Sequence, residues 1–372
     1  MSNTQKKNVS ELRFPEFEGE WEEKQLGNII KVNSGKDYKH LDKGDIPVYG
    51  TGGYMTSVSE PLSEIDAVGI GRKGTINKPY LLEAPFWTVD TLFYCTPKKE
   101  TDILFILSLF RKINWKVYDE STGVPSLSKQ TINKINRFVP TNKEQQKIGK
   151  FFSKLDRQIE LEEQKLELLQ QQKKGYMQKI FSQELRFKDE NGNDYPDWTN
   201  ERLGEVTTVT MGQSPKSVNY TDNSNDTVLI QGNADIENGL INPRIYTREV
   251  TKLIQKDEII LTVRAPVGKL AMAQINACIG RGVCSIKGDK FLYYFLEWFA
   301  TQNKWIRFSQ GSTFESISGN DIRNIHIKIP VEDERTKIIK LLNSLDVLNS
   351  KTDLKIQNLK QRKQSLLQKI FV

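Results

Sequence analysis

A glycine-rich segment is the first stretch of this sequence whose residue types and spacing suggest chemistry. Gly69, Gly71 and Gly74 form the pattern G-x-G-x-x-G, and Asp90 follows about 20 positions later. In a dinucleotide-binding fold such glycines open a helix, whose first N–H groups hold the pyrophosphate. Pro79 and Pro85 interrupt any helix that starts here. We therefore expect a strand and a tight turn, not a cofactor site.

A related segment occurs in the second half of the chain. Arg72 follows the apolar run Ala67–Ile70, and Arg264 follows the apolar run Glu258–Val263, with a glycine and a lysine close behind in both places. Arginine can read guanine, and arginine or lysine can neutralise a phosphate. The pattern predicts one basic turn in each half that contacts nucleic acid, although a solvated hairpin with ordinary surface charges is the alternative.

Other catalytic chemistry has no residue pattern to support it. The three cysteines, Cys95, Cys278 and Cys284, lack C-x-x-C spacing, and the two histidines, His40 and His326, stand far apart. The sequence contains no phosphate-loop, amino-methyltransferase, nuclease or serine-hydrolase motif. We expect no catalytic residues, no metal and no cofactor in this chain, and a role in recognition or scaffolding.

The bulk composition is consistent with a folded protein of more than one domain. The chain has 372 residues, of which 27% are charged, and its net charge of +7 permits a polyanionic partner. No apolar run approaches the roughly 18 residues of a membrane span, and the first residues lack the apolar core of a signal peptide. We expect a cytoplasmic protein.

Internal repetition decides the domain organisation. Residues 131–156 align with residues 321–346, so that Leu155-Asp156 matches Leu345-Asp346, and the pattern W-x4-L-G occurs at Trp21 and again at Trp198. Short β-like runs bounded by glycine, proline and aspartate fill the front of each copy, including Ile46–Gly50, Thr88–Cys95 and Thr227–Ile230. Short helices are expected at Thr101–Asn114 and Lys290–Asn303. The predicted fold is α+β, with two tandem units that each end in a long helix.

The two long helices carry matching heptad patterns. Apolar residues recur with alternating steps of four and three from Ile148 to Ile180 and again from Ile338 to Ile370. A capping box is expected at Thr141–Glu144. The seam could join two chains, but equal lengths and coincident polar positions at Lys173 and Lys363 favour an antiparallel pair within one chain, with pseudo-twofold symmetry. The expected seam residues are Phe152, Leu155, Ile159, Leu166, Leu169, Leu342, Leu345, Ile356, Leu359 and Leu366.

The repeated segments resemble a known family. "SLSKQTINKINRFVPTNKEQQKIGKFFSKLD" and "SISGNDIRNIHIKIPVEDERTKIIKLLNSLD" are similar to the hallmark of the specificity subunits of type I restriction-modification enzymes. Gln145 keeps the usual Glu-Gln pair, Arg335 replaces its glutamine, and the second proline of I-P-x-P is absent from both copies. The resemblance covers nearly the whole chain. It implies two target-recognition domains at residues 1–142 and 185–331, with conserved long helices at residues 143–184 and 332–372.

The resemblance also implies a mechanism and partners. Each recognition domain would read one half of a bipartite double-stranded DNA target, and the helices would set the spacer between the halves. Two methyltransferase subunits and restriction (translocase) subunits would assemble on the chain, and S-adenosylmethionine, Mg²⁺ and ATP would be bound by those partners. A coiled-coil scaffold without DNA recognition and a standalone DNA-modifying enzyme with an unrecognised site are the alternatives.

Charge and loop context suggest which residues contact DNA, although sequence alone does not separate base contacts from phosphate contacts. The expected DNA-binding residues are Lys36, Arg72, Lys73, Lys78, Gln213, Lys216, Arg244, Arg264 and Lys269.

Overall fold

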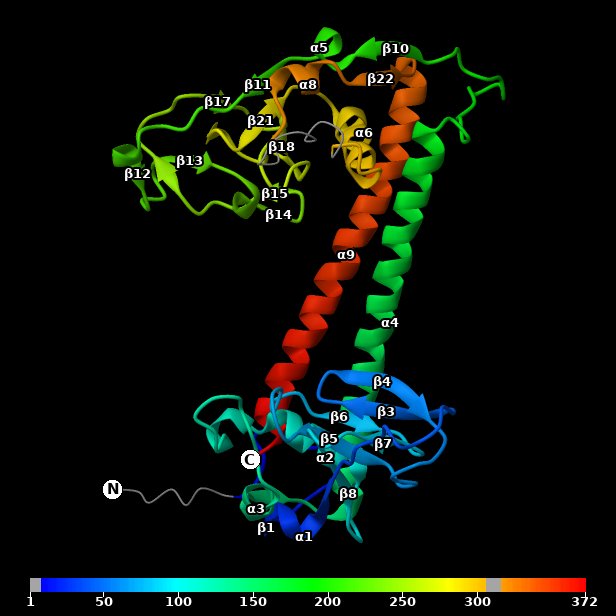
Figure 1. The fold of residues 1–372 in the computed structure, drawn as a ribbon, viewed down its shortest axis with the longest axis vertical. Helices are drawn as coiled ribbons and strands as arrows, with labels where there is room; N and C mark the ends of the chain where they lie inside the picture. The colour runs from blue at the N-terminus through cyan, green and yellow to red at the C-terminus, as the bar shows by residue number, and fades with distance from the viewer. Residues whose placement is uncertain (1–7, 306–315) are drawn as a thin grey trace. The chain divides into compact units, whose positions relative to one another are not determined.

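The chain forms two compact units that share both long helices. The computed structural model describes residues 8–305 and 316–372 (Figure 1). Unit 1 comprises Met1–Gln164 and Thr352–Val372, and unit 2 comprises Lys165–Lys351. Each unit therefore contains one sheet-rich region and one part of each long helix, and its boundaries cut across the four segments expected from the sequence.

Unit 1 is built on two small sheets. The strands of the first, in the order in which they pair, are β2 (Ile30–Ser34), β8 (Leu92–Pro97), β5 (Ala67–Gly71) and β6 (Tyr80–Leu82). Those of the second are β4 (Gly53–Val58), β3 (Ile46–Gly50) and β7 (Trp87–Thr88). The remaining elements are β1 (Glu22–Gln25), α1 (Leu26–Ile29), α2 (Ile103–Lys112), the 3-10 helix η1 (Trp115–Tyr118), α3 (Lys129–Lys134) and β9 (Asn136–Val139), which pairs with β1.

Unit 2 is also built on two sheets, with more strands in each. One sheet contains β11 (Val209–Met211), β21 (Val283–Ile286), β18 (Ile259–Thr262), β19 (Leu270–Met272), β15 (Leu240–Ile241) and β14 (Ile236–Glu237). The other contains β12 (Tyr220–Thr221), β16 (Tyr246–Thr247), β13 (Thr227–Ile230), β20 (Ala277–Ile279) and β17 (Leu253–Ile254). Around them lie β10 (Thr199–Arg202), α5 (Leu203–Val206), the 3-10 helices η2 (Ser217–Asn219) and η3 (Asn233–Asp235), α6 (Lys290–Thr301), α8 (Gly319–Arg323) and β22 (His326–Ile329), the partner of β10.

The expected α+β fold with tandem units is confirmed, with one local correction. β3 and β13 match the predicted strands, and α2 and α6 lie within the two predicted short helices. The run Thr88–Cys95 is not one strand, because a turn at residues 89–91 separates β7 from β8. The glycine motif also behaves as predicted, since Gly69 and Gly71 lie in β5 and Gly74 follows in a turn with φ of +86°.

The cores are formed where the short helices cover the sheets. Phe105, Ile106 and Phe110 of α2 are fully buried in unit 1, as Leu296 of α6 is in unit 2. Each of these helices is capped at its start by an aspartate: the Asp102 side chain accepts the N–H of Phe105 at 2.8 Å. Capping of this kind satisfies an otherwise unpaired donor at the helix start. It fixes where α2 begins.

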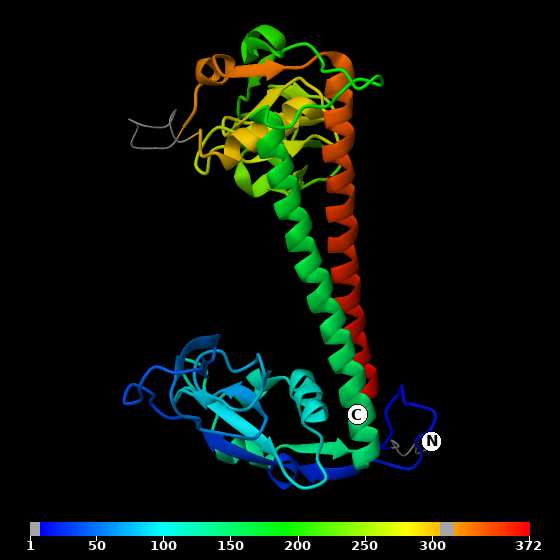
Figure 2. The ribbon, with the colours of Figure 1, turned by 90° about the vertical axis from the view of Figure 1, so that its right-hand side faces the viewer.

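The long helices α4 (Asn142–Phe181) and α9 (Glu332–Ile370) pair within the chain. In each unit, the part of α4 and the part of α9 that belong to it lie side by side (Figure 1, Figure 2). Phe152, Leu155, Ile159, Leu166, Leu169, Leu342, Leu345, Ile356, Leu359 and Leu366, the ten expected seam residues, are all buried or partly buried.

Ion pairs fix the antiparallel register of this seam. In unit 2, Lys173 of α4 lies 2.7 Å from a carboxylate oxygen of Asp346 on α9. In unit 1 the roles are exchanged, since Lys363 of α9 pairs with Asp156 of α4. The two lysines that interrupt the heptads thus each bind the aspartate of the repeated Leu-Asp pair on the opposite helix.

A buried glutamate in the first turn of each long helix holds the chain that precedes each recognition region. Both oxygens of Glu144 accept hydrogen bonds from Arg13 at 2.7 Å, and Trp21 Nε1 donates to the same carboxylate at 3.3 Å. Glu334 receives the equivalent bonds from Arg186, both at 2.8 Å, and from Trp198 at 2.9 Å. The carboxylate of Glu144, expected in a capping box, is therefore used to bind Arg13 and Trp21.

We predict that Glu144→Ala and Glu334→Ala each destabilise the unit that contains them. The glutamate side chains are 1% and 0% exposed, so removal leaves Arg13 or Arg186 without its buried partner, at a cost of about 3 kcal/mol. Chemical denaturation of the purified variants measures this loss. Glu160→Ala is the matched control, because Glu160 forms an exposed pair with Arg157 on α4 and its loss should cost under about 0.5 kcal/mol. Equal effects from all three substitutions would contradict the prediction.

Candidate nucleic-acid interface

Several loops of unit 1 meet at the turn of residues 89–91. The N–H of Lys36, just after β2, donates to Thr88 O at 2.8 Å. The N–H of Val89 donates to Tyr49 O of β3 at 3.0 Å, and the N–H of Arg72, just after β5, donates to Thr91 O at 2.8 Å. Backbone hydrogen bonds therefore hold the loop after β2, the strand β3 and the loop after β5 around this turn, which we call the hub turn of unit 1.

The turn of residues 280–282 is the hub turn of unit 2, because the same bonds recur there. Gln213 N–H donates to Ile279 O at 2.9 Å, Gly280 N–H to Ile230 O at 2.7 Å, and Val263 N–H to Gly282 O at 2.9 Å. Lys36 and Gln213, both predicted DNA contacts, consequently occupy the same position in the two units.

The structure corrects the predicted match between the basic turns by one residue. Arg72 is equivalent to Val263, since their carbonyls accept the N–H groups of Leu127 and Ile317, both at 2.9 Å. Lys73 is therefore the counterpart of Arg264, and these two residues form the equivalent β-bridges to Ser126 and Ser316. A basic residue is still present at the same place in both units.

Glycine is required where the first loop passes the hub turn. A Cβ atom at Gly35 would lie 2.0 Å from Val89 O, and one at Gly212 would lie 2.1 Å from Gly280 O. Such distances are far below van der Waals contact, so any side chain would displace the loop. The close approach brings Lys36 and Gln213 next to their hub turns.

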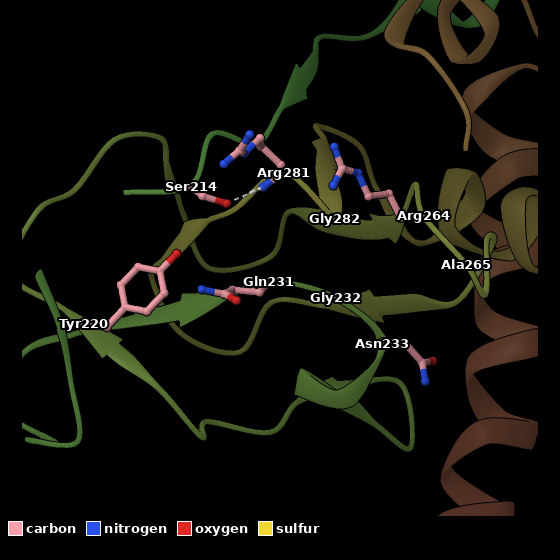
Figure 3. A pocket seen from close by; sticks show the side chains of 9 residues that line it. All are labelled: Ser214, Tyr220, Gln231, Gly232, Asn233, Arg264, Ala265, Arg281 and Gly282. Atoms are coloured by element: carbon pink, nitrogen blue, oxygen red, sulfur yellow. Dashed lines mark hydrogen bonds between the residues drawn. The ribbon is translucent and has the colours of Figure 1, made fainter. Parts of the chain in front are cut away.

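The loops of unit 2 line an open cavity of about 440 Å³. Arg264 is the one predicted DNA-binding residue that lines it. The other lining residues, drawn with it in Figure 3, are Ser214, Tyr220, Gln231, Gly232, Asn233, Ala265, Arg281 and Gly282. Sequence reasoning missed Arg281, because only the one-residue shift in register aligns residues 280–282 with residues 89–91. It also missed Gln231, an uncharged residue that follows β13.

The cavity carries positive charge that no carboxylate of the described residues neutralises. Arginines of the scaffold, such as Arg13 and Arg186, form ion pairs. Among residues 8–305 and 316–372, no carboxylate lies within ion-pair distance of Arg264 or Arg281, whose guanidinium groups extend to the same side in Figure 3. Gln231 adds a buried Nε2 that has no hydrogen-bond partner in the same part of the chain. Such a site suits an anionic, hydrogen-bonding ligand.

Two predicted DNA-binding residues support this cavity instead of lining it. The carboxylate of Asp235 accepts the N–H groups of Gln231 and Gly232 at 2.8 and 3.1 Å, and Arg244 lies 4.0 Å from its other oxygen. The ammonium of Lys269 donates to Asn233 O at 3.2 Å and to Ile236 O at 2.6 Å. Both cations therefore bind acceptor groups of the loop at residues 231–236 and hold that loop in place.

The remaining predicted residues lie in three separate places. Lys36, Arg72 and Lys73 are exposed around the hub turn of unit 1, where Arg72 Nη1 lies 3.4 Å from Asp90 O. Lys78 lines a different groove of unit 1, together with Arg111 and Lys363. In unit 2, Lys216 is exposed, and its backbone N–H is bound by Glu249. The structure thus brings together Lys36, Arg72 and Lys73 in unit 1, and Gln213 and Arg264 in unit 2.

Two classes of group in the described part of the chain, side chains that can ligate metals and cysteine thiols, have surroundings that bear on their reactivity. No group of three or more His, Cys, Asp and Glu side chains within residues 8–305 and 316–372 could hold a metal ion. The three cysteines are buried, and burial raises the pKa of Cys284 to about 12 and that of Cys95 still further. Both remain neutral thiols at neutral pH. None of the helices in this part of the chain is long and apolar enough to cross a membrane.

Two copies of a domain with a variable loop cluster and a long helix define a class of tandem recognition proteins. The sequence matches the family model of the type I restriction modification DNA specificity domain twice, at residues 18–171 and 195–361. The chain belongs to this family. The resemblance found in the repeated segments is therefore confirmed.

One curated relative is similar in sequence, and two solved structures are similar in fold. The chain is 30% identical over 261 residues to the putative type I restriction enzyme MjaX specificity subunit of Methanocaldococcus jannaschii, an alignment that covers 66% of this chain and 61% of that relative. The S subunit of the type I restriction-modification system of M. genitalium shares the fold, with a TM-score of 0.68, 16% identity and coverage of 98% and 99%. A chain of a type I R-M system, solved in a study of complex assembly and conformational transition, also has this fold. Its TM-score is 0.59, with 19% identity and coverage of 94% and 97%.

We predict that Asp235→Ala loosens the cavity of unit 2 without unfolding it. The carboxylate is buried and binds the N–H groups of Gln231 and Gly232, so its removal leaves both donors unpaired. Hydrogen exchange measured by mass spectrometry should become at least tenfold faster in a peptide that contains residues 231–233. Asp222→Ala, which changes an exposed aspartate of the same unit, is the control and should leave that peptide unchanged. Unchanged exchange in Asp235→Ala would show that the loop is held by other contacts.

Proposed function

We propose that the chain is the DNA-recognition subunit of a type I restriction-modification assembly. Each loop cluster reads one half of a bipartite target, and chemistry is left to partner subunits. The observation that carries this proposal is the hub turn, which is built twice with the same backbone hydrogen bonds but different side chains. One framework with two sets of side chains suits a protein that reads two different half-sites.

The electrostatics of the loop clusters support DNA as the ligand. Arg264 and Arg281 in unit 2, and Lys36 and Lys73 in unit 1, are exposed beside the hub turns. Cations placed in this way neutralise phosphates, and the released counterions favour binding at moderate salt. A scaffold without DNA recognition would have no use for unneutralised arginines around a polar cavity, so this alternative is disfavoured.

The partners follow from the family. Two methyltransferase subunits would supply S-adenosylmethionine chemistry on adenine, and restriction subunits with ATP and Mg²⁺ would supply translocation and cleavage. The exposed sides of α4 and α9 are the proposed docking surface for the methyltransferase subunits. The assembly would act on chromosomal and invading DNA in the cytoplasm.

Methylome sequencing with and without the gene tests this function. We expect deletion to abolish adenine methylation at one bipartite motif, because the methyltransferase subunits lose the subunit that selects the site. Complementation with the gene should restore the same motif. If no methylated motif depends on the gene while the partner subunits are expressed, the proposal is wrong. If the purified chain alone cut or methylated DNA, the standalone-enzyme alternative would be favoured.

The shared helices suggest how the spacer between half-sites is set. Both helices contribute residues to both units, and their ion-paired register fixes one helix against the other. One heptad spans about 10.5 Å at 1.5 Å per residue, which corresponds to about three base pairs of B-DNA. We propose that helix length determines the number of base pairs between the half-sites.

Deleting residues 160–166 and 353–359 together tests the role of helix length. These heptads face each other, and their removal keeps the seam in phase and retains both Lys–Asp pairs. We expect methylation of the same two half-sites with a spacer shorter by up to about three base pairs. The level of methylation should fall, because a spacer shorter by about three base pairs rotates one half-site by about 100° around the duplex axis relative to the other. The methylome of the variant gives this result, and altered half-site sequences would contradict the division of roles.

A further inference from the structure

The middle residue of the hub turn carries opposite charges in the two units. The turn reads Val89-Asp90-Thr91 in unit 1 and Gly280-Arg281-Gly282 in unit 2. Asp90 and Arg281 are equivalent, because the residues on either side of each make the same backbone hydrogen bonds. Both side chains are exposed. A single position on one backbone framework therefore carries a carboxylate in one unit and a guanidinium in the other.

The position of Lys73 and Arg264 carries the same sign of charge in both units. Lys73 and Arg264 are equivalent, and both are basic and exposed. Phosphates are the same in every DNA sequence, so two units that read different half-sites can keep the same charge against the backbone. This pair therefore has the character expected of a phosphate contact in both units.

Phosphate contact cannot account for the position of Asp90 and Arg281. A carboxylate beside a phosphate would be repelled, so a position that accepts aspartate in one unit does not face the DNA backbone in that unit. The edges of base pairs, in contrast, offer hydrogen-bond partners to both negatively and positively charged side chains. Aspartate can accept a hydrogen bond from cytosine N4, and arginine can donate two bonds to guanine O6 and N7.

The surroundings of Arg281 favour a base contact. Its backbone N–H donates to Ser214 Oγ at 3.1 Å, which pins the turn to the loop after β11. The cavity that it lines also contains the Gln231 amide, whose Nε2 lacks a hydrogen-bond partner in the described part of the chain. A buried donor left without a partner is costly, and the edge of a base pair would supply an acceptor.

We propose that the middle residue of each hub turn reads a base pair, while the basic residue at Lys73 and Arg264 binds phosphate. Arg281 selects guanine in the half-site of unit 2, and Asp90 selects cytosine in the half-site of unit 1. This inference rests on the proposed function and adds to it the residues and the base chemistry that determine each half-site.

The test compares the same substitution at two arginines of one cavity. Arg281→Lys and Arg264→Lys are expressed in the complete assembly in cells, and each methylome is sequenced. Lysine keeps the charge but loses the bidentate fork. We expect Arg281→Lys to relax one guanine of one half-site, with a preference for guanine reduced about 5- to 100-fold, and to leave the other half-site unchanged. Arg264→Lys should leave both half-sites and the methylation level near those of the wild type.

Asp90→Asn extends the test to unit 1. It should relax or change one cytosine position in the half-site that Arg281→Lys leaves intact. Arg264→Ala and Lys73→Ala should lower methylation at every instance of the motif while its letters stay the same. The purified variants should also bind target duplex with a weaker salt dependence, because each has lost one phosphate contact.

Three results would overturn the inference. The wild-type motif could lack a G·C pair in one half-site, Arg281→Lys could keep every letter of the motif, or Arg281 and Asp90 could affect the same half-site. Each of these leaves a bipartite motif that depends on the gene, so the proposed function would survive. Loss of the proposed function has a different signature, since no bipartite motif would then depend on the wild-type gene.

Discussion

Two buried carboxylates anchor the architecture of this protein. Glu144 and Glu334 lie at the starts of the long helices and are bound by an arginine in bidentate geometry and by a tryptophan N–H. A buried carboxylate is tolerated only when such partners satisfy its oxygens. Each glutamate therefore fixes three parts of the chain at once: the helix, the segment with Arg13 or Arg186, and the strand that follows Trp21 or Trp198. The loops that recognise a ligand are built outward from this fixed point.

In the loop clusters, the shape of the backbone and the chemistry of the exposed side chains are determined by different groups. Their shape is set by backbone hydrogen bonds, such as those of Lys36 and Gln213, and by glycines at positions 35 and 212 that permit close approach. Backbone bonds do not depend on side-chain identity, so the exposed residues of the hub turn can differ without a change of fold. This explains how Asp90 and Arg281 occupy one position. Two units of one protein can therefore share a framework and still present different side chains.

The sequence predicted what depends on periodicity and repetition. The heptads of α4 and α9 and the repeated Leu-Asp pairs gave the fold, because these signals are regular and extend over many residues. The loops carried no such signal. Lys269 and Arg244 could not be distinguished from ligand-binding cations in sequence, since their acceptors, Asn233 O and Asp235, are brought to them only by tertiary structure. The tetrapeptide Glu-Leu-Arg-Phe, present at residues 11–14 and 184–187, was an available signal for the Arg13 and Arg186 anchors.

The polar residues in the helix seam show that register has been favoured over maximum stability. Burial lowers the pKa of the seam residue Lys363, and it raises the pKa of Glu297 on α6, which is a second partner of the seam residue Lys173, so each charged form carries a desolvation cost. For Glu297, a folded-state pKa above the unfolded value means that this cost is present at neutral pH and disappears on acidification. Apolar residues at these positions would bury more surface but would accept several registers. A slip of one heptad would separate Lys173 and Lys363 from Asp346 and Asp156, the aspartates of the repeated Leu-Asp pairs. The ion pairs therefore select one alignment of the helices, and a fixed alignment is what a protein needs if helix length is to determine the spacing of two DNA half-sites.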